Sequence, residues 1–189
     1  MKLEIKPLTP ALAAGFFDFF DNRAFTDRDG AFCYCTWFHC VCSVEEHYQP
    51  GRDAMRECAG NYIKNGVLNG YLVYDGNIAA GWCNTDKKEN YPRLMNDPFL
   101  CAGNTEKTKA VVCFEIAPEY RGKGIAAALL ARICDDAKAQ GYDFVESYPA
   151  SHQKYDPFDY AGPARLYEKL GFVKASEQNQ SLVMRKELR

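Results

Sequence analysis

One stretch, Val111 to Gly141, most constrains what this chain can fold into, because it predicts a strand, a tight turn and a helix in direct succession. Val111 to Ile116 is rich in residues that favour strands, and Pro118, which has no N–H to donate to a sheet, ends the strand. From Ile125 onward, apolar side chains recur with the period of a helix. Gly141 follows the last predicted turn, where a C-terminal glycine is expected.

The turn Arg121-Gly122-Lys123-Gly124 has the composition of an anion-binding site. The first N–H groups of a helix have no intrahelical partner, and the helix dipole adds partial positive charge beside them. Glycines lack a Cβ, so a phosphate can approach the backbone closely, and Arg121 and Lys123 add full charges. The turn therefore predicts a phosphate site. The alternative is an ordinary strand–helix turn with solvated basic side chains.

Two segments resemble signatures of the GNAT superfamily of acetyl-CoA-dependent N-acetyltransferases. Arg121-Gly122-Lys123-Gly124-Ile125-Ala126 is similar to that family's Arg/Gln-x-x-Gly-x-Gly/Ala turn. Ala164 to Phe172 is similar to its late helix and the start of the following strand. The resemblance covers Val111 to Phe172 best and Tyr71 to Cys83 less closely.

This resemblance implies a fold and a cosubstrate. The expected fold is α/β, a GNAT-like central mixed β-sheet of six or seven strands flanked by about four helices. The expected cosubstrate is acetyl-CoA, with its pyrophosphate on the turn and its pantetheine arm and reacting oxyanion against backbone at the end of the preceding strand. The implied cofactor-binding residues are Ile116, Ala117, Arg121, Gly122, Lys123, Gly124, Ile125 and Ala126.

A different nucleotide site competes for the same turn. Gly122-x-Gly124-x-x-Ala127 also satisfies the dinucleotide-binding fingerprint, and Glu146 lies about 20 residues on, as that motif requires. The glycines, however, do not follow the strand directly, and the chain left after Glu146 is too short for the rest of a doubly wound sheet. A lone match of this kind is weak.

Length and composition indicate one globular domain, residues 1–189, with 47% hydrophobic and 14% aromatic residues. The net charge of −2 argues against a nucleic-acid partner, and no basic amphipathic stretch argues for a membrane surface. Because the N-terminus has no apolar signal core, we expect a cytoplasmic protein. The sequence allows a homodimer and does not set the oligomeric state.

Local patterns predict further elements along the chain. Thr9-Pro10 has the form of a helix cap followed by proline at the first helical position. Asp21 to Pro50 and Lys87 to Thr108 show no clear period and are expected to be irregular. The remaining predictions are strands at Leu3–Lys6, Phe144–Tyr148 and Ser181–Met184, a helix at Asp53–Asn65, and a hairpin from Tyr71 to Cys83.

Acetyl transfer to an amine needs a base for the amine, an acid for the departing thiolate and a donor for the oxyanion. The resemblance puts Tyr167 in the position of the tyrosine that commonly protonates the thiolate; the alternative is a packed aromatic ring. Glu146 is the leading candidate for the base, and Glu115 competes with it. Glu146 and Glu115 each interrupt an apolar strand, where a carboxylate is costly unless it is paired or used. Either could instead be a strand-edge carboxylate facing solvent.

The sequence departs from the family pattern just before Tyr167. The family usually has an asparagine seven residues earlier, and Tyr160 stands there. The insert that precedes it contains His152, a further candidate base, or is a solvated loop. Candidate contacts to the acceptor are Trp37, Phe38, His39, Tyr148 and His152.

Four of the nine cysteines bracket a histidine: Cys33, Cys35, Cys40 and Cys42 lie around His39. Four thiols and an imidazole can suggest zinc, but the spacing is not that of a zinc ribbon or finger. Packing of small apolar side chains is the favoured interpretation, so no metal is expected; metal binding and a redox-active thiol remain open.

The sequence therefore predicts an N-acetyltransferase that moves the acetyl group of acetyl-CoA to a primary amine of a small molecule or peptide by direct attack. The alternative is a non-catalytic CoA-binding regulator whose Cys-rich segment senses metal or oxidant. The sequence does not identify the acceptor amine.

Overall fold

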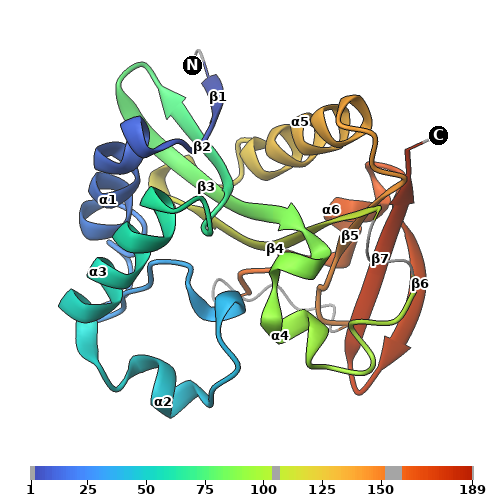
Figure 1. The fold of residues 1–189 in the computed structure, drawn as a ribbon. Coiled ribbons are helices and arrows are strands. Elements are labelled where there is room, and N and C mark those ends of the chain that lie inside the picture. The colour runs from blue at the N-terminus through green and yellow to red at the C-terminus, as the bar shows by residue number, and fades with distance from the viewer. Residues whose placement is uncertain (1–2, 104–106, 152–158, 189) are drawn as a thin grey trace.

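The computed structural model describes residues 3–103, 107–151 and 159–188 (Figure 1). One seven-stranded sheet crosses the molecule in the order β1-β2-β3-β4-β5-β7-β6. The strands are β1 (Leu3–Pro7), β2 (Gly70–Asp75), β3 (Ile78–Lys87), β4 (Thr108–Ile116), β5 (Phe144–Ser147), β6 (Val173–Gln178) and β7 (Ser181–Glu187).

The sheet is mixed, as predicted. β4 and β5 are parallel and the other neighbouring pairs are antiparallel. Helix α5 (Ile125–Ala139) makes the crossover between the two parallel strands, which need a long connection. The predicted strand–turn–helix is thus confirmed, and it lies at the centre of the sheet.

Helices cover both faces of this sheet (Figure 1). The described helices are α1 (Ala13–Asn22), α2 (Val44–Tyr48), α3 (Gly51–Lys64), α4 (Pro92–Met95), α5 and α6 (Ala164–Glu168). Tyr71 and Val73 of β2 pack with α5 and α6, whereas Leu72 and Tyr74 pack with α1 and α3. This alternation follows from the two-residue period of a strand, and it divides the apolar core into two layers.

The two stretches expected to be irregular contain short helices. Between residues 21 and 50 lie a 3-10 turn, Trp37–His39, and α2; between residues 87 and 108 lie the 3-10 turn Lys88–Asn90 and α4. These elements have three to five residues, too few to show a helical period in the sequence. The described chain therefore has six α-helices where about four were expected.

The predicted cap at Thr9 is wrong in one respect. The Thr9 side chain makes no capping hydrogen bond, and Pro10–Leu12 forms a 3-10 turn that runs directly into α1. Pro10 does occupy the first position of that turn, as its fixed φ favours.

The central cleft arises where β4 and β5 separate. Their pairing ends at Val111 and Ser147, and β4 continues to Ile116 without β5 beside it. The chain at Tyr160 lies in this gap, where its carbonyl accepts a hydrogen bond from the Phe114 N–H at 2.6 Å. The free end of β4 is thus exposed to a cleft on one side of the sheet and to a pocket on the other.

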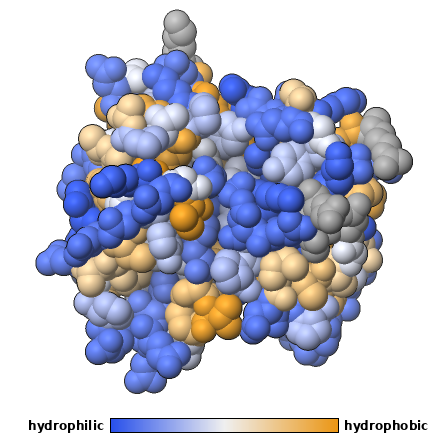
Figure 2. Space-filling model, in the orientation of Figure 1, coloured by the Kyte–Doolittle hydropathy of each residue, from blue (hydrophilic) through white to orange (hydrophobic). Residues whose placement is uncertain are grey.

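The surface seen in Figure 2 is largely hydrophilic, with small apolar patches scattered among charged side chains. Within the described ranges, no helix is both long and apolar enough to cross a bilayer.

Candidate active site

A cleft of about 370 Å³ lies beside the predicted anion-binding turn. Gly122 and Gly124 adopt φ of 74° and 79°, the left-handed region that favours glycine. Among the residues that the structure describes, an added Cβ at either glycine would meet no atom within 4 Å, so the backbone there faces open space. In the described chain no side chain caps the first turn of α5, which leaves its N–H groups free for an anion.

The opposite wall of this cleft carries two basic side chains that the sequence did not single out. Arg165 and Lys169 come from α6 and the residue after it, and they line the cleft together with Pro163 and Leu166. Their spacing of four residues places both on one face of a helix, which was the available signal. Together with Arg121, they make the cleft suited to an anion.

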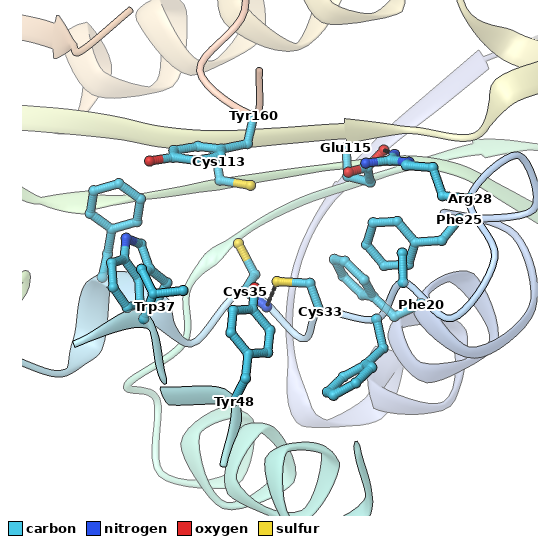
Figure 3. A pocket seen from close by; sticks show the side chains of 14 residues that line it. Phe20, Phe25, Arg28, Cys33, Cys35, Trp37, Tyr48, Cys113, Glu115 and Tyr160 are labelled. Carbon is cyan, nitrogen blue, oxygen red and sulfur yellow. Dashed lines mark hydrogen bonds and ion pairs between the residues drawn. The ribbon is translucent and has the colours of Figure 1, made fainter. Parts of the chain in front are cut away.

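A second pocket, also about 370 Å³, opens on the other face of β4 (Figure 3). Aromatic and thiol side chains dominate its wall; Cys113 and Tyr160 lie on one side of it, and Cys33, Cys35 and Tyr48 on the other (Figure 3). The lining residues are Phe20, Phe25, Arg28, Ala31, Phe32, Cys33, Cys35, Trp37, Phe38, Val44, Tyr48, Cys113, Glu115 and Tyr160.

Glu115 and Tyr160 line both pockets, so the two cavities meet there. Arg28 donates to the Glu115 carboxylate at 2.8 Å, and Arg121 lies 3.4 Å from the same oxygen. Burial raises the pKa of Glu115 to about 7, although both guanidinium groups act to lower it. A carboxyl group that titrates near neutrality can take up a proton and release it again.

Cys35 forms part of the floor of the second pocket in a strained conformation. It has φ of 58° and is buried, and Asn84 donates to its carbonyl at 3.0 Å and to its sulfur at 3.3 Å. Burial opposes ionisation of this thiol, but hydrogen bonds, led by that from Cys113, outweigh it and lower its pKa. A non-glycine residue in this region is held there by its surroundings.

Tyr167 is buried behind the cleft and lines neither pocket. Its hydroxyl donates to the Ala161 carbonyl, and its ring packs on Phe114 and Phe172. Burial raises its pKa well above the ordinary value, so the hydroxyl is protonated at neutral pH. The Ala161 contact ties it to the segment that enters the gap beside β4.

Glu146 also lies away from both pockets. Its carboxylate is fully buried and accepts hydrogen bonds from Lys88 at 2.8 Å, Arg185 at 2.7 Å and Tyr148 at 3.1 Å. These three donors satisfy a charge that burial would otherwise make costly. The structure thus brings Glu115, and not Glu146, together with the cleft.

Some of the residues predicted to contact the acceptor line the second pocket, and others lie elsewhere. Trp37 and Phe38 line the second pocket, while Tyr148 bonds to Glu146. His39 is buried between Tyr62 and Tyr91, and burial lowers its pKa to about 4. Neither of its ring nitrogens has a hydrogen-bond partner within residues 3–103, 107–151 and 159–188. His152 lies outside the described residues.

Comparison with known proteins decides the family. A sequence model described as an acetyltransferase (GNAT) domain matches residues 69–174, more than half of the chain. The chain belongs to the GNAT acetyltransferase family. No curated protein matches it.

Solved structures share the fold of this GNAT protein at low sequence identity. A putative GNAT acetyltransferase from Desulfovibrio desulfuricans is 17% identical, with a TM-score of 0.60 and all of both chains covered. The PaiA N-acetyltransferase from Thermoplasma acidophilum, solved with coenzyme A, is 16% identical, with a TM-score of 0.59 and 99% of both chains covered. A chain of the NatC complex bound to Gag peptide and CoA is 14% identical, with a TM-score of 0.58 and all of both chains covered.

The mixed sheet of this GNAT protein also removes the dinucleotide alternative. That fingerprint requires an open, mostly parallel sheet of two βαβαβ halves, and here one neighbouring pair of strands is parallel.

Proposed function

We propose that this protein transfers the acetyl group of acetyl-CoA to a primary amine by direct attack. The observation that carries the proposal is the meeting of two cavities at Glu115, one lined by a basic, glycine-containing turn and the other by aromatic side chains. Such an arrangement lets two substrates approach one carboxylate from opposite faces of β4. The coenzyme A in the structure of the Thermoplasma acidophilum relative supports the choice of cosubstrate.

The cleft residues fit acetyl-CoA by their chemistry. The N–H groups at the start of α5, with Gly122, Gly124 and Lys123, would hold the pyrophosphate. The Arg121 guanidinium is paired with Asp27 and Glu115, so it would contribute its charge and not a direct hydrogen bond. Backbone at Ile116, with the α5 residues Ile125 and Ala126, would line the path of the pantetheine arm. Ala117, which the sequence also suggested, is buried, and its N–H donates to the Ala80 carbonyl at 3.1 Å. When bound, acetyl-CoA supplies an acyl group activated as a thioester.

Glu115 is the proposed base. An alkylamine is mostly protonated at neutral pH and must lose a proton before it can attack. With a pKa of about 7, Glu115 is substantially ionised at neutral pH and lies at the junction of the pockets. Arg28 and Arg121 orient its carboxylate. Glu146 remains the alternative base, but its carboxylate lines neither pocket and is held by Lys88, Arg185 and Tyr148.

Tyr167 is the proposed acid for the departing thiolate. Its raised pKa keeps the proton on the hydroxyl until a strong base develops nearby. To act, the hydroxyl has to turn from the Ala161 carbonyl toward the cleft. A role confined to anchoring the chain at Ala161 is the alternative.

The second pocket favours an amine attached to an apolar or aromatic group. Phe25, Phe32, Trp37 and Phe38 present rings to its interior, and Glu115 is the carboxylate that would meet the ammonium group. Aromatic faces attract cations and apolar groups alike. We therefore expect arylalkylamines to be better acceptors than polyamines.

Calorimetry of acetyl-CoA binding tests the first half of the proposal. Gly124→Glu puts a carboxylate beside the expected pyrophosphate and should abolish binding. Gly141→Glu is a matched control, because Gly141 follows the other end of α5, has φ of 81° and also has open space around it. Equal loss in both variants, or no binding to the wild type, would contradict the proposed cosubstrate site.

Release of the coenzyme A thiol with a panel of amines tests the second half. Turnover that requires an amine supports the acetyltransferase. Tight acetyl-CoA binding without turnover of arylalkylamines, polyamines or peptide amines would favour the CoA-binding regulator instead.

A further inference from the structure

Three metal-ligating side chains come together on the outer side of the wall of the second pocket. The sulfurs of Cys40 and Cys42 lie 2.6 Å apart, and Nδ1 of His47 lies 3.5 Å from the Cys40 sulfur. All three ligand atoms fall within 4.8 Å of one another. His39, the histidine between the cysteines in sequence, does not belong to this group.

We propose that Cys40, Cys42 and His47 bind one zinc ion, which fixes the segment that forms the wall of the second pocket. Soft thiolates together with an imidazole are the donor set that zinc prefers. Binding releases the protons of both thiols and uses the neutral imidazole, so charge and protons balance. Within the described residues no fourth His, Cys, Asp or Glu joins the group, which leaves one position for water.

The distances fit such a site. With Zn–S of about 2.3 Å and Zn–N of about 2.0 Å at tetrahedral angles, sulfur and nitrogen ligands lie about 3.5 Å apart. The separation of Cys40 Sγ and His47 Nδ1 is 3.5 Å. Two sulfur ligands would lie about 3.8 Å apart, so the Cys40 and Cys42 side chains must separate by about 1 Å. Rotation about χ1 of either cysteine allows this change.

The local sequence holds His47 in place. Ser43 and Glu46 form a capping box, with the Glu46 N–H donating to the Ser43 hydroxyl at 3.1 Å and the Ser43 N–H to the Glu46 carboxylate at 2.8 Å. The box starts α2 directly after Cys42 and sets His47 one turn into the helix. Nδ1 of His47 then lies 3.5 Å from the Cys40 sulfur.

Arg93 adds positive charge next to the two sulfurs. Its guanidinium lies 3.9 Å from the Cys40 sulfur, donates to the Cys42 carbonyl at 2.6 Å and stacks on Trp37 at 3.3 Å. A bound zinc ion would replace the protons of both thiols, and the two thiolates would neutralise its charge. Arg93 would hold the Cys42 backbone in place.

The site connects to the second pocket through two residues of the same segment and one ring contact. Val44 and Tyr48 of α2 line the pocket, whereas His47 of the same helix belongs to the metal group. The Trp37 ring, which also lines the pocket, lies 5.1 Å from the His47 ring. Zinc would therefore fix the positions of these three wall residues. This effect on acceptor binding rests on the proposed function; metal binding does not.

Metal content gives the first test. Protein purified under reducing conditions without chelator should contain about one zinc per chain, and cobalt titrated into the apoprotein should give a thiolate-to-cobalt charge-transfer band. Loss of a residue that only hydrogen-bonds to a metal ligand weakens metal binding by roughly 10–100-fold. Cys42→Ser and His47→Gln each remove a ligand itself, so each should weaken binding by more than that. Cys101→Ser, a partly exposed cysteine elsewhere, is the matched control and should bind as the wild type does.

Alkylation of the wild type gives a test that needs no variant. Zinc should protect Cys40 and Cys42 from iodoacetamide, as read by mass spectrometry of the peptides, and should leave Cys101 reactive. A reduced wild type with no metal and no cobalt band would overturn the proposal. So would metal that Cys42→Ser retains, which would then be adventitious.

The effect of zinc on the second pocket is tested by steady-state kinetics and acetyl-CoA binding. Removal of zinc should raise KM for the amine and leave the acetyl-CoA dissociation constant unchanged. An unchanged KM would limit the metal to stability, and an absence of any turnover would contradict the proposed function without affecting the metal site.

Discussion

Replacing Glu115 by Gln should remove the base from the junction of the two pockets while keeping the shape of the side chain. A positioned general base contributes about 10²–10⁴-fold to rate. At about 1.36 kcal/mol per factor of ten, Glu115→Gln should therefore cost about 3–5 kcal/mol of transition-state stabilisation in kcat/KM. The substitution also neutralises the partner of Arg28, 2.8 Å away, so folding must be checked alongside activity.

The pH profile gives the sharper measurement. The pKa of Glu115 is raised to about 7, and only the ionised form can accept the proton of the amine. For the wild type, kcat/KM should rise about tenfold from one unit below that pKa to one unit above it and then level off. The acceptor should be an arylalkylamine whose amine stays protonated throughout this range. Glu115→Gln should show no such rise.

A substitution of Arg28 should shift the pKa of Glu115 in a known direction. Its guanidinium favours the ionised form of Glu115, so Arg28→Met should raise that pKa further. The midpoint of the pH profile should then move to higher pH, with lower activity at neutrality. A midpoint that stays in place would mean that another group sets the profile.

The matched control is Glu146→Gln. This change leaves Lys88 and Arg185 without their buried carboxylate, and breaking a buried pair costs about 3–5 kcal/mol of stability. Urea denaturation should show that loss of stability. The protein that remains folded should show the same midpoint in the pH profile of kcat/KM as the wild type. A pH-dependent loss of activity in Glu146→Gln, with Glu115→Gln as active as wild type, would refute the assignment of Glu115.

Three further substitutions test other parts of the molecule. Tyr167→Phe should lower turnover by about 10²-fold or more with acetyl-CoA binding unchanged; unchanged turnover would leave the hydroxyl only an anchoring role. Arg165→Glu should raise the acetyl-CoA dissociation constant by reversing charge in the cleft, with KM for the amine unaffected, as steady-state kinetics and calorimetry would show. Gly70→Ala should lower the free energy of unfolding by about 1–3 kcal/mol or more, as measured by urea denaturation, because the added Cβ would lie 2.1 Å from the Cys83 carbonyl oxygen. Wild-type stability would contradict this packing.

The sequence was most informative where the determining interactions are local. The turn between β4 and α5 could be predicted because Gly122 and Gly124 supply left-handed φ and the apolar period of the next 15 residues supplies the helix. The short helices α2 and α4 could not be found in this way. The capping box of Ser43 and Glu46 was a readable signal for α2, but one turn of helix has no detectable period.

Candidate residues could be named from the sequence, but their roles depend on burial and on partners distant in the chain. Glu115 and Glu146 look alike as carboxylates in apolar strands. Burial in the pocket raises the pKa of Glu115 to about 7, against the opposing effect of Arg28, which lies 87 residues earlier in the chain. Lys88 and Arg185 instead satisfy Glu146 inside the protein. No local pattern contains these pairings.

The cysteine segment shows the same division. The spacing of Cys40, Cys42 and His47 is visible in the sequence, yet His39 lies closer to the cysteines along the chain. Only the folded segment shows that His47 faces the two sulfurs and that His39 is enclosed by Tyr62 and Tyr91. The sequence by itself determined the strand–turn–helix and with it the family, because short-range backbone preferences specify them. The tertiary structure decided which glutamate, which histidine and which thiols lie together, because burial and through-space charge arise only when distant segments pack.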